Sequence, residues 1–134
     1  MPTVELEIPS RSPYVGVVRL AMASLARSAG FDEEAVDDLK IAVSEACANS
    51  VLSNEEAGVT SGVNVTWELH DDRLVIEVAD RGNVYDPDGP PQEDSQGFHS
   101  RWFMSVALLQ SLVDDSEFVP RDGGGMIARL IFTR

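Results

Sequence analysis

A carboxylate and an amide lie four residues apart in an otherwise uncharged stretch of this sequence. Glu45 is the one charged residue between Ile41 and Leu52, and Asn49 follows it. Side chains at this spacing project from the same flank of a helix. A carboxylate at such a place can act as a general base, and an amide oxygen can bind Mg²⁺. The alternative is a solvated glutamate beside a neutral asparagine.

A second candidate site is the short sequence Asp80-Arg81-Gly82, which follows an apolar run. Asp80 is expected at the end of a strand, with Gly82 two residues later. Glycine has no β-carbon, so the backbone there can pass close to a planar ligand. The same pattern is common in ordinary turns. The segment therefore indicates either a ligand site or a turn.

Five further side chains could carry chemistry, and each has a simpler interpretation. His99 and Arg101 could meet an anion, although a pair in a polar loop is more commonly solvated. Cys47 is expected to be a packed core thiol and not a redox sensor. Trp67 and Trp102 are expected to pack in the sheet and the core, and not to serve as ligand platforms.

The spacing of apolar residues predicts the elements that position these side chains. Alternation over residues 4–8 indicates a strand, and Ser12-Pro13 is expected to begin a helix that ends at Gly30. That helix should turn the following residues toward a core: Val17, Val18, Ala21, Leu25 and Ala26. Asp32 should cap a second helix that runs to about Ser53. Its expected core face is Val36, Leu39, Val43, Ala46 and Cys47.

The second half of the chain is expected to contain two hairpins and one more helix. Residues 63–70 and 74–79 form the first hairpin, with a turn at Asp71-Asp72. Residues 81–101 read as a long functional or disordered loop, 102–112 as a helix, and 116–119 with 126–133 as the last hairpin. This order predicts a single α+β domain over residues 1–134. Its architecture is a two-layer sandwich, with helices on one face of a mainly antiparallel mixed sheet.

Composition narrows the classes of partner. The formal net charge is -13, and a surface this acidic repels phosphate backbones and anionic lipids. No apolar run reaches the roughly 18 residues that a membrane helix requires. The N-terminus does not resemble a signal peptide, and the single cysteine fits a reducing compartment. We therefore expect a cytoplasmic protein that binds neither nucleic acid nor membranes, and the charge suits a basic protein partner or simple solubility.

Taken together, these segments resemble the RsbW-like anti-sigma factor serine kinases, the switch proteins of the GHKL ATPase superfamily. The resemblance covers residues 4–133 and is strongest at 42–49, 79–82, 85–87, 112–115 and 121–125. It implies that Glu45 is the general base and that Asn49 coordinates Mg²⁺ on ATP. It implies that Asp80 and Gly82 bind adenine, with Asp80 accepting a hydrogen bond from the adenine amino group. Arg19 matches an arginine that the family's first helix offers to protein partners, although it could be an ordinary exposed charge.

The sequence also departs from the family's pattern at several positions. The second glycine of the family's Asp-x-Gly-x-Gly is Val84, and the glycines expected near the start of the third helix are Phe103 and Ser105. A β-carbon at these places obstructs close backbone approach to phosphates. Met126 replaces a threonine that helps to fix adenine, and Ser53 replaces a common histidine. These departures predict weak binding of ATP or none.

By resemblance, the chain sequesters an alternative sigma factor, and an anti-anti-sigma antagonist displaces it. An active member would phosphorylate that antagonist on a serine with Mg·ATP. Two alternatives remain: a non-catalytic protein-binding module with an eroded ATP site, and a stand-alone ATPase-like domain with another protein partner. Members of the family bind sigma factors as homodimers, so the resemblance predicts a homodimer built through the first helix and the neighbouring sheet edge.

Overall fold

A computed structural model describes residues 2–84 and 98–134, with residues 98–100 described by their backbone alone. The elements, in chain order, are β1 (Thr3–Ile8), the 3₁₀ helix η1 (Ser12–Tyr14), α1 (Val15–Ser28), α2 (Glu33–Glu56), β2 (Val63–Leu69), β3 (Arg73–Ala79), α3 (Phe98–Leu112), β4 (Asp115–Pro120) and β5 (Met126–Thr133). The predicted elements are therefore present, with ends that shift by a few residues.

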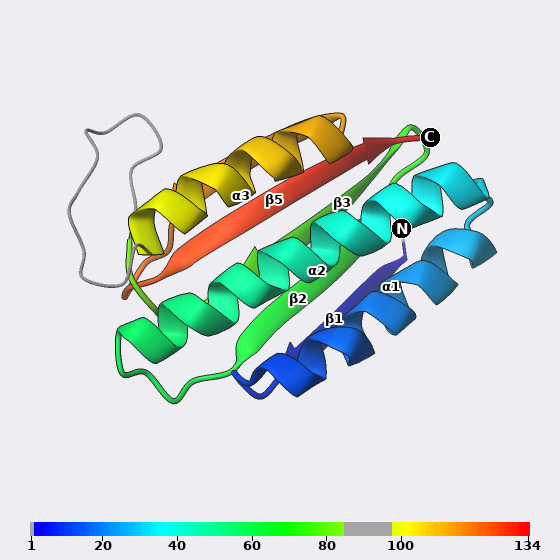
Figure 1. The fold of residues 1–134 in the computed structure, drawn as a ribbon. Helices are drawn as coiled ribbons and strands as arrows, with labels where there is room; N and C mark the ends of the chain where they lie inside the picture. The colour runs from blue at the N-terminus through cyan, green and yellow to red at the C-terminus, as the bar shows by residue number, and fades with distance from the viewer. Residues whose placement is uncertain (1, 85–97) are drawn as a thin grey trace.

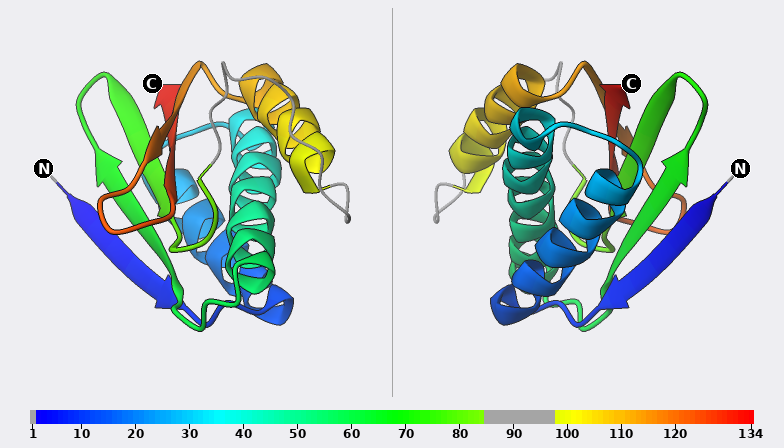
Figure 2. Two further views of the ribbon diagram at one scale, coloured as in Figure 1. Left: turned by 90° about the vertical axis from the view of Figure 1, so that its left-hand side faces the viewer. Right: turned by 90° about the vertical axis from the view of Figure 1, so that its right-hand side faces the viewer.

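Five strands form one sheet in the order β1-β2-β3-β5-β4, and each pairing among the described strands is antiparallel. All three helices cover the same face of this sheet (Figures 1 and 2). Helix α2 runs along the middle of the helical layer, with α1 on one side and α3 on the other (Figure 1). The prediction of an α+β two-layer sandwich is confirmed.

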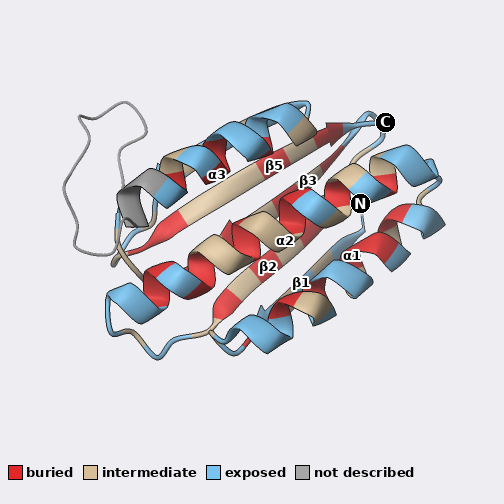
Figure 3. Cartoon of the chain, in the orientation of Figure 1, coloured by how far each residue is buried: buried red, intermediate tan, exposed pale blue. Residues whose placement is uncertain are grey.

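The core lies between the sheet and the helical layer. Alternate residues of β2 and β3 are buried, because successive side chains of a strand point to opposite faces. Helix α2 is buried along much of its length, whereas α1 and α3 keep exposed outer faces (Figure 3). The expected core face of α2 is confirmed, and its five residues are buried: Val36, Leu39, Val43, Ala46 and Cys47. Burying one large aliphatic side chain contributes about 1.5–3 kcal/mol.

Helix α2 begins and α1 ends where the local sequence predicts. The side chain of Asp32 accepts a hydrogen bond from the backbone N–H of Ala35 at 2.8 Å, so Asp32 is the N-cap of α2. Gly30 adopts a positive φ of 90° after α1. The N–H groups of Gly30 and Phe31 then bond the carbonyls of Arg27 and Ala26, which satisfies the last turn of α1.

Two expectations about α1 were wrong. Ser12-Pro13 does not begin the long helix, because residues 12–14 form a separate 3₁₀ turn without a side-chain cap, and α1 begins at Val15. Val17 is 54% exposed and does not face the core. Consecutive residues of a helix point about 100° apart, and Val17 lies on the flank of α1 that is turned away from the sheet. Val15, Val18 and Met22 form the buried stripe.

Within the described part of the chain, no helix combines the length and the apolar character needed to cross a membrane.

Candidate functional site

Asp80 is a buried carboxylate at the end of β3, only 4% exposed. Its Oδ1 accepts hydrogen bonds from the backbone N–H groups of Gly82, at 3.0 Å, and Met126, at 3.2 Å. Burial raises the pKa of Asp80, while hydrogen bonds from Gly82, Met126 and the Ser50 side chain oppose that rise. The Asp80-Arg81-Gly82 pattern thus identified a carboxylate that is buried and has a raised pKa, as functional carboxylates often do.

Two glycines allow the backbone to pack tightly around Asp80. A β-carbon on Gly82 would lie 2.3 Å from the hydroxyl oxygen of Ser53 on α2. A β-carbon on Gly125 would lie 2.0 Å from the carbonyl oxygen of Asp80, and Gly125 has a positive φ of 96°. The contact with α2 already requires glycine at position 82. Its predicted contact with adenine stays a prediction.

Asn54 joins the ends of three strands to α2, and sequence reasoning missed it. Its side chain is fully buried and donates to the Ser10 hydroxyl at 3.0 Å and to the Ser61 carbonyl at 3.1 Å. Its Oδ1 accepts from the backbone N–H of Arg81 at 2.9 Å. Nearby, the Ser53 hydroxyl accepts from the N–H of Asn83 at 2.9 Å. These bonds fix the segment that follows β3, and with it Asp80.

One sequence signal could have identified Asn54. Positions 43, 46, 50 and 54 continue the buried stripe of α2 at helical spacing. A polar residue at the end of such a stripe is buried and requires hydrogen-bond partners. The sequence alone does not show which segments provide those partners.

Asn49 lies on α2, and its side chain reaches α3. Its side-chain amide donates a hydrogen bond to the hydroxyl of Ser105, which is buried on α3. Glu45 is partly buried one turn earlier on α2. The two residues share a groove of about 470 Å³ between α2 and α3, which Arg101 and Ser105 also line. The structure therefore brings the predicted base and the predicted metal ligand together on one helix flank.

Asn49 and Asp80 also line a second, much smaller space under α3. This cavity has a volume of about 30 Å³ and is bordered by α2, α3 and the ends of three strands. Its aromatic lining is Trp102 from α3 and Phe118 from β4, whose rings meet edge to face with centroids 6.2 Å apart. A cavity of this size holds water but no planar ring system, since pockets for small ligands measure about 300–1,000 Å³.

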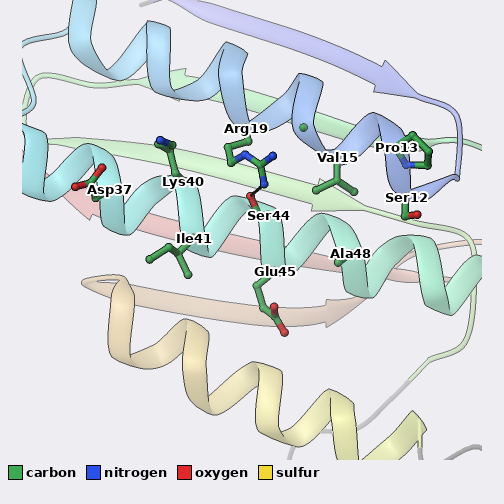
Figure 4. A pocket seen from close by; sticks show the side chains of 11 residues that line it. Ser12, Pro13, Val15, Arg19, Asp37, Lys40, Ile41, Ser44, Glu45 and Ala48 are labelled. Atoms are coloured by element: carbon green, nitrogen blue, oxygen red, sulfur yellow. Dashed lines mark hydrogen bonds between the residues drawn. The ribbon is translucent and has the colours of Figure 1, made fainter.

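Arg19 lies away from this cavity, in a groove of about 820 Å³ between α1 and α2. Its Nη1 donates to the Ser44 hydroxyl at 3.4 Å, and Lys40 lies one helical turn before Ser44 (Figure 4). Glu45 also lines this groove. The structure therefore separates Arg19 from Asp80 and connects it with Glu45 along the surface of α2.

The remaining candidates have varied outcomes. Tyr85-Asp86-Pro87 and the side chain of His99 lie outside the described residues. Cys47 and Trp67 are buried in the main core, as expected. Trp102 is also packed, as expected, although its place in the small cavity beside Asp80 was not foreseen.

Comparison with known proteins assigns this chain to a family. Residues 8–132 match the model of the histidine kinase-like ATPase domain. The chain belongs to this family. It is 40% identical to the serine-protein kinase RsbW of Halalkalibacterium halodurans, over 97% of this chain and 83% of that protein. It is 32% identical to RsbW of Oceanobacillus iheyensis, over 84% of this chain and 75% of the relative. It therefore belongs to the RsbW group of this family.

A solved structure supports the same fold. The chain superposes on a Mycobacterium tuberculosis protein that contains RsbU and RsbW domains, with a TM-score of 0.73 and 21% identity. The superposition covers all of this chain and 33% of that longer one.

The family implies ATP, and the sequence predicts that Asp80 and Asn49 hold it, but the cavity that these two residues line does not fit a purine. The hydrogen bonds described above use Asp80 Oδ1 and Asn49 Nδ2, whereas Mg²⁺ would bind Asn49 through its Oδ1, so the disagreement with ATP rests on the size of the cavity. The space between the two residues is the cavity of about 30 Å³.

Proposed function

We propose that this chain is an anti-sigma factor, which binds an alternative sigma factor and withholds it from RNA polymerase in the cytoplasm. An anti-anti-sigma antagonist would compete for the same protein and release the sigma factor. Membership of the RsbW group supports this assignment. The acidic charge of -13 also favours a basic protein surface over nucleic acid.

The observation that carries the proposal is the groove between α1 and α2. Its walls combine apolar side chains, including Val15 and Ile41, with charges of both signs. Arg19 and Lys40 line it, and neither takes part in the ion pairs found among the described residues. A cation that forms no salt bridge within the described residues is available to an acidic side chain of an incoming protein segment. We assign this groove to a segment of the sigma factor.

Phosphorylation of the antagonist is not part of this proposal. Glu45 as general base and Asn49 as a ligand of Mg²⁺ on ATP remain predictions. Glu45 is placed where a partner in the α1–α2 groove could reach it. The Asn49 side chain donates to Ser105 through Nδ2, and its Oδ1 is the atom that would bind Mg²⁺.

We also propose that two copies pair through α1 and the sheet edge at β1. β1 is an outer strand of the sheet, so one row of its backbone groups is unpaired within the described sheet. Tyr14 at the end of η1 and Val17 and Leu20 in α1 are exposed apolar residues spaced three apart. Replacing Leu20 by Lys should shift a dimer toward monomer in analytical ultracentrifugation, and an unchanged mass in a folded variant would argue against this interface.

Surface plasmon resonance with the purified sigma factor tests the function. Arg19→Glu should weaken binding by at least about tenfold, because it places an acid where the partner offers one. Arg27→Glu is the matched control, since it makes the same charge change on α1 but removes an exposed pair with Glu33. Equal affinities for both variants would remove Arg19 from the interface.

Salt dependence supplies a second measure of the same interaction. The acidic surface should steer a basic partner, so association should slow as salt shortens the Debye length, which is about 10 Å at 0.1 M. Dissociation should change less. An association rate that does not respond to salt would contradict the steering argument, and binding to DNA in place of the sigma factor would overturn the function.

A further inference from the structure

Trp102 and its neighbours form a small hydrophobic cluster that is separate from the main core. Trp102, Val106 and Met126 are its buried members, and Phe103 and Phe118 pack against them. The Trp102 ring meets Phe103 edge to face, with centroids 5.5 Å apart. Aromatic side chains thus fill the region between α3 and the last two strands.

This cluster lies against the carboxylate that the family relationship associates with adenine. Met126 donates its backbone N–H to Asp80, and its side chain packs with Trp102. Asp80, Asn49, Trp102 and Phe118 all line the cavity of about 30 Å³. A flat ring that approached Asp80 from this cavity would have to share the space with the indole.

We infer that Trp102 occupies the purine position of this ATPase fold, so that the chain closes its own nucleotide site. The indole is a flat aromatic ring system, as a purine is, and it is only 6% exposed. To admit a purine, it must leave the apolar cluster for water, and that cost is subtracted from the affinity of the ligand.

A hydrogen bond between Asn49 and Ser105 also holds α3, and with it Trp102, beside the cavity. The Asn49 amide donates to the Ser105 hydroxyl, which links α2 to α3 beside the cavity. Ser105 and Trp102 lie three residues apart, so both come from the same side of α3. A nucleotide would therefore have to displace the Trp102 ring from a helix that the Asn49–Ser105 bond holds against α2. This inference depends on family membership and does not depend on the identity of the protein partner.

Isothermal titration of the full chain with Mg·ATP, and separately with adenosine, tests the inference. Trp102→Ala and Trp102→Leu should bind adenosine at least about tenfold more tightly than the unmodified chain, because each variant vacates the space of the indole. Met104→Ala is the matched control, because Met104 lies on the same helix and is 73% exposed. That variant should bind no better than the unmodified chain.

Tryptophan fluorescence gives a second reading that does not require Trp102 to be removed. Trp67 is the other tryptophan, so Trp67→Phe leaves Trp102 as the sole reporter. We expect emission typical of a buried indole, and a shift to longer wavelength if saturating Mg·ATP forces the ring into water. Tight binding of Mg·ATP with unchanged Trp102 emission would overturn the inference. So would folded Trp102 variants whose affinity for adenosine equals that of the unmodified chain.

Discussion

The side-chain amide of Asn49 on α2 donates a hydrogen bond to the buried hydroxyl of Ser105 on α3. Ser105 stands where the family is expected to have a glycine. Ser105 thus provides a partner for the asparagine that was predicted from the sequence to be a metal ligand. A partly buried amide that keeps this partner stabilises the contact between the two helices.

Removing that partner should measurably destabilise the fold. We expect Ser105→Ala to lower the free energy of unfolding by about 1–2 kcal/mol, because the amide of Asn49 loses its acceptor. Ser111→Ala is the control, since Ser111 is exposed on the same helix and its hydroxyl donates to the Leu108 carbonyl one turn earlier. It should change stability by less than about 0.5 kcal/mol. Urea unfolding of both variants would decide, and equal effects would contradict a structural role for the Asn49–Ser105 bond.

Two adjacent glycines provide a matched pair for testing the packing around Asp80. Gly124 and Gly125 both have positive φ angles, of 105° and 96°. A β-carbon on Gly124 would meet nothing within 4 Å, whereas one on Gly125 would meet the Asp80 carbonyl oxygen at 2.0 Å. Gly124→Ala should therefore cost about 1–2 kcal/mol from backbone strain alone. Gly125→Ala should cost at least about 3 kcal/mol, because backbone must also move. Similar unfolding midpoints for the two variants would show that the approach to Asp80 is looser than described.

The pH dependence of stability should reveal the buried carboxylate. Burial raises the pKa of Asp80 above its ordinary value of 3.8, so the folded state binds a proton more readily than the unfolded state. The stability that this proton contributes is therefore fully present below the unfolded-state pKa. It is lost as the pH rises through the raised pKa of folded Asp80. Asp80→Asn keeps an oxygen that can accept from Gly82 and Met126 but carries no charge.

We expect the Asp80→Asn variant to gain stability relative to the unmodified chain near neutral pH. The gain should shrink as the pH falls below the raised pKa, because Asp80 is then neutral in the unmodified chain as well. Thermal unfolding from pH 3 to pH 8 measures the difference between the two proteins, in which the shared carboxylates cancel. A difference that grows on acidification would reverse the sign of this argument.

The sequence predicted the elements whose signals are local. Asp32 was predicted as the N-cap of α2 because a short acidic side chain there precedes apolar residues at helical spacing. Alternation of apolar and polar residues along β2 and β3 determines which face of each strand is buried. The facing of α1 was harder, because Val17 and Val18 are both apolar and only the docked helix shows which one is buried. Tertiary packing makes that choice.

The candidate site was less predictable, because its contacts join distant segments. Asp80 and Asn49 could be chosen from residue type and position. The partners of Asn54 could not, since its bonds reach Ser10 and Arg81, which lie 44 and 27 residues away. Apolar spacing predicted that Trp102 would pack, but it carries no information on which cavity the ring would enter.

Cys47 provides a probe of how often the whole core opens. The thiol is fully buried, and burial raises the pKa of Cys47 to about 12. The thiolate is the reactive form, so near pH 8 the folded chain should react with a disulfide reagent only through opening of α2 from the sheet. Ser111→Cys adds an exposed thiol on α3, which should react at once and calibrate the reagent. We expect the Cys47 reaction to be slow without denaturant and to accelerate with urea in parallel with unfolding. Rapid stoichiometric labelling of Cys47 in the folded chain would mean that α2 separates from the sheet far more readily than its buried face implies.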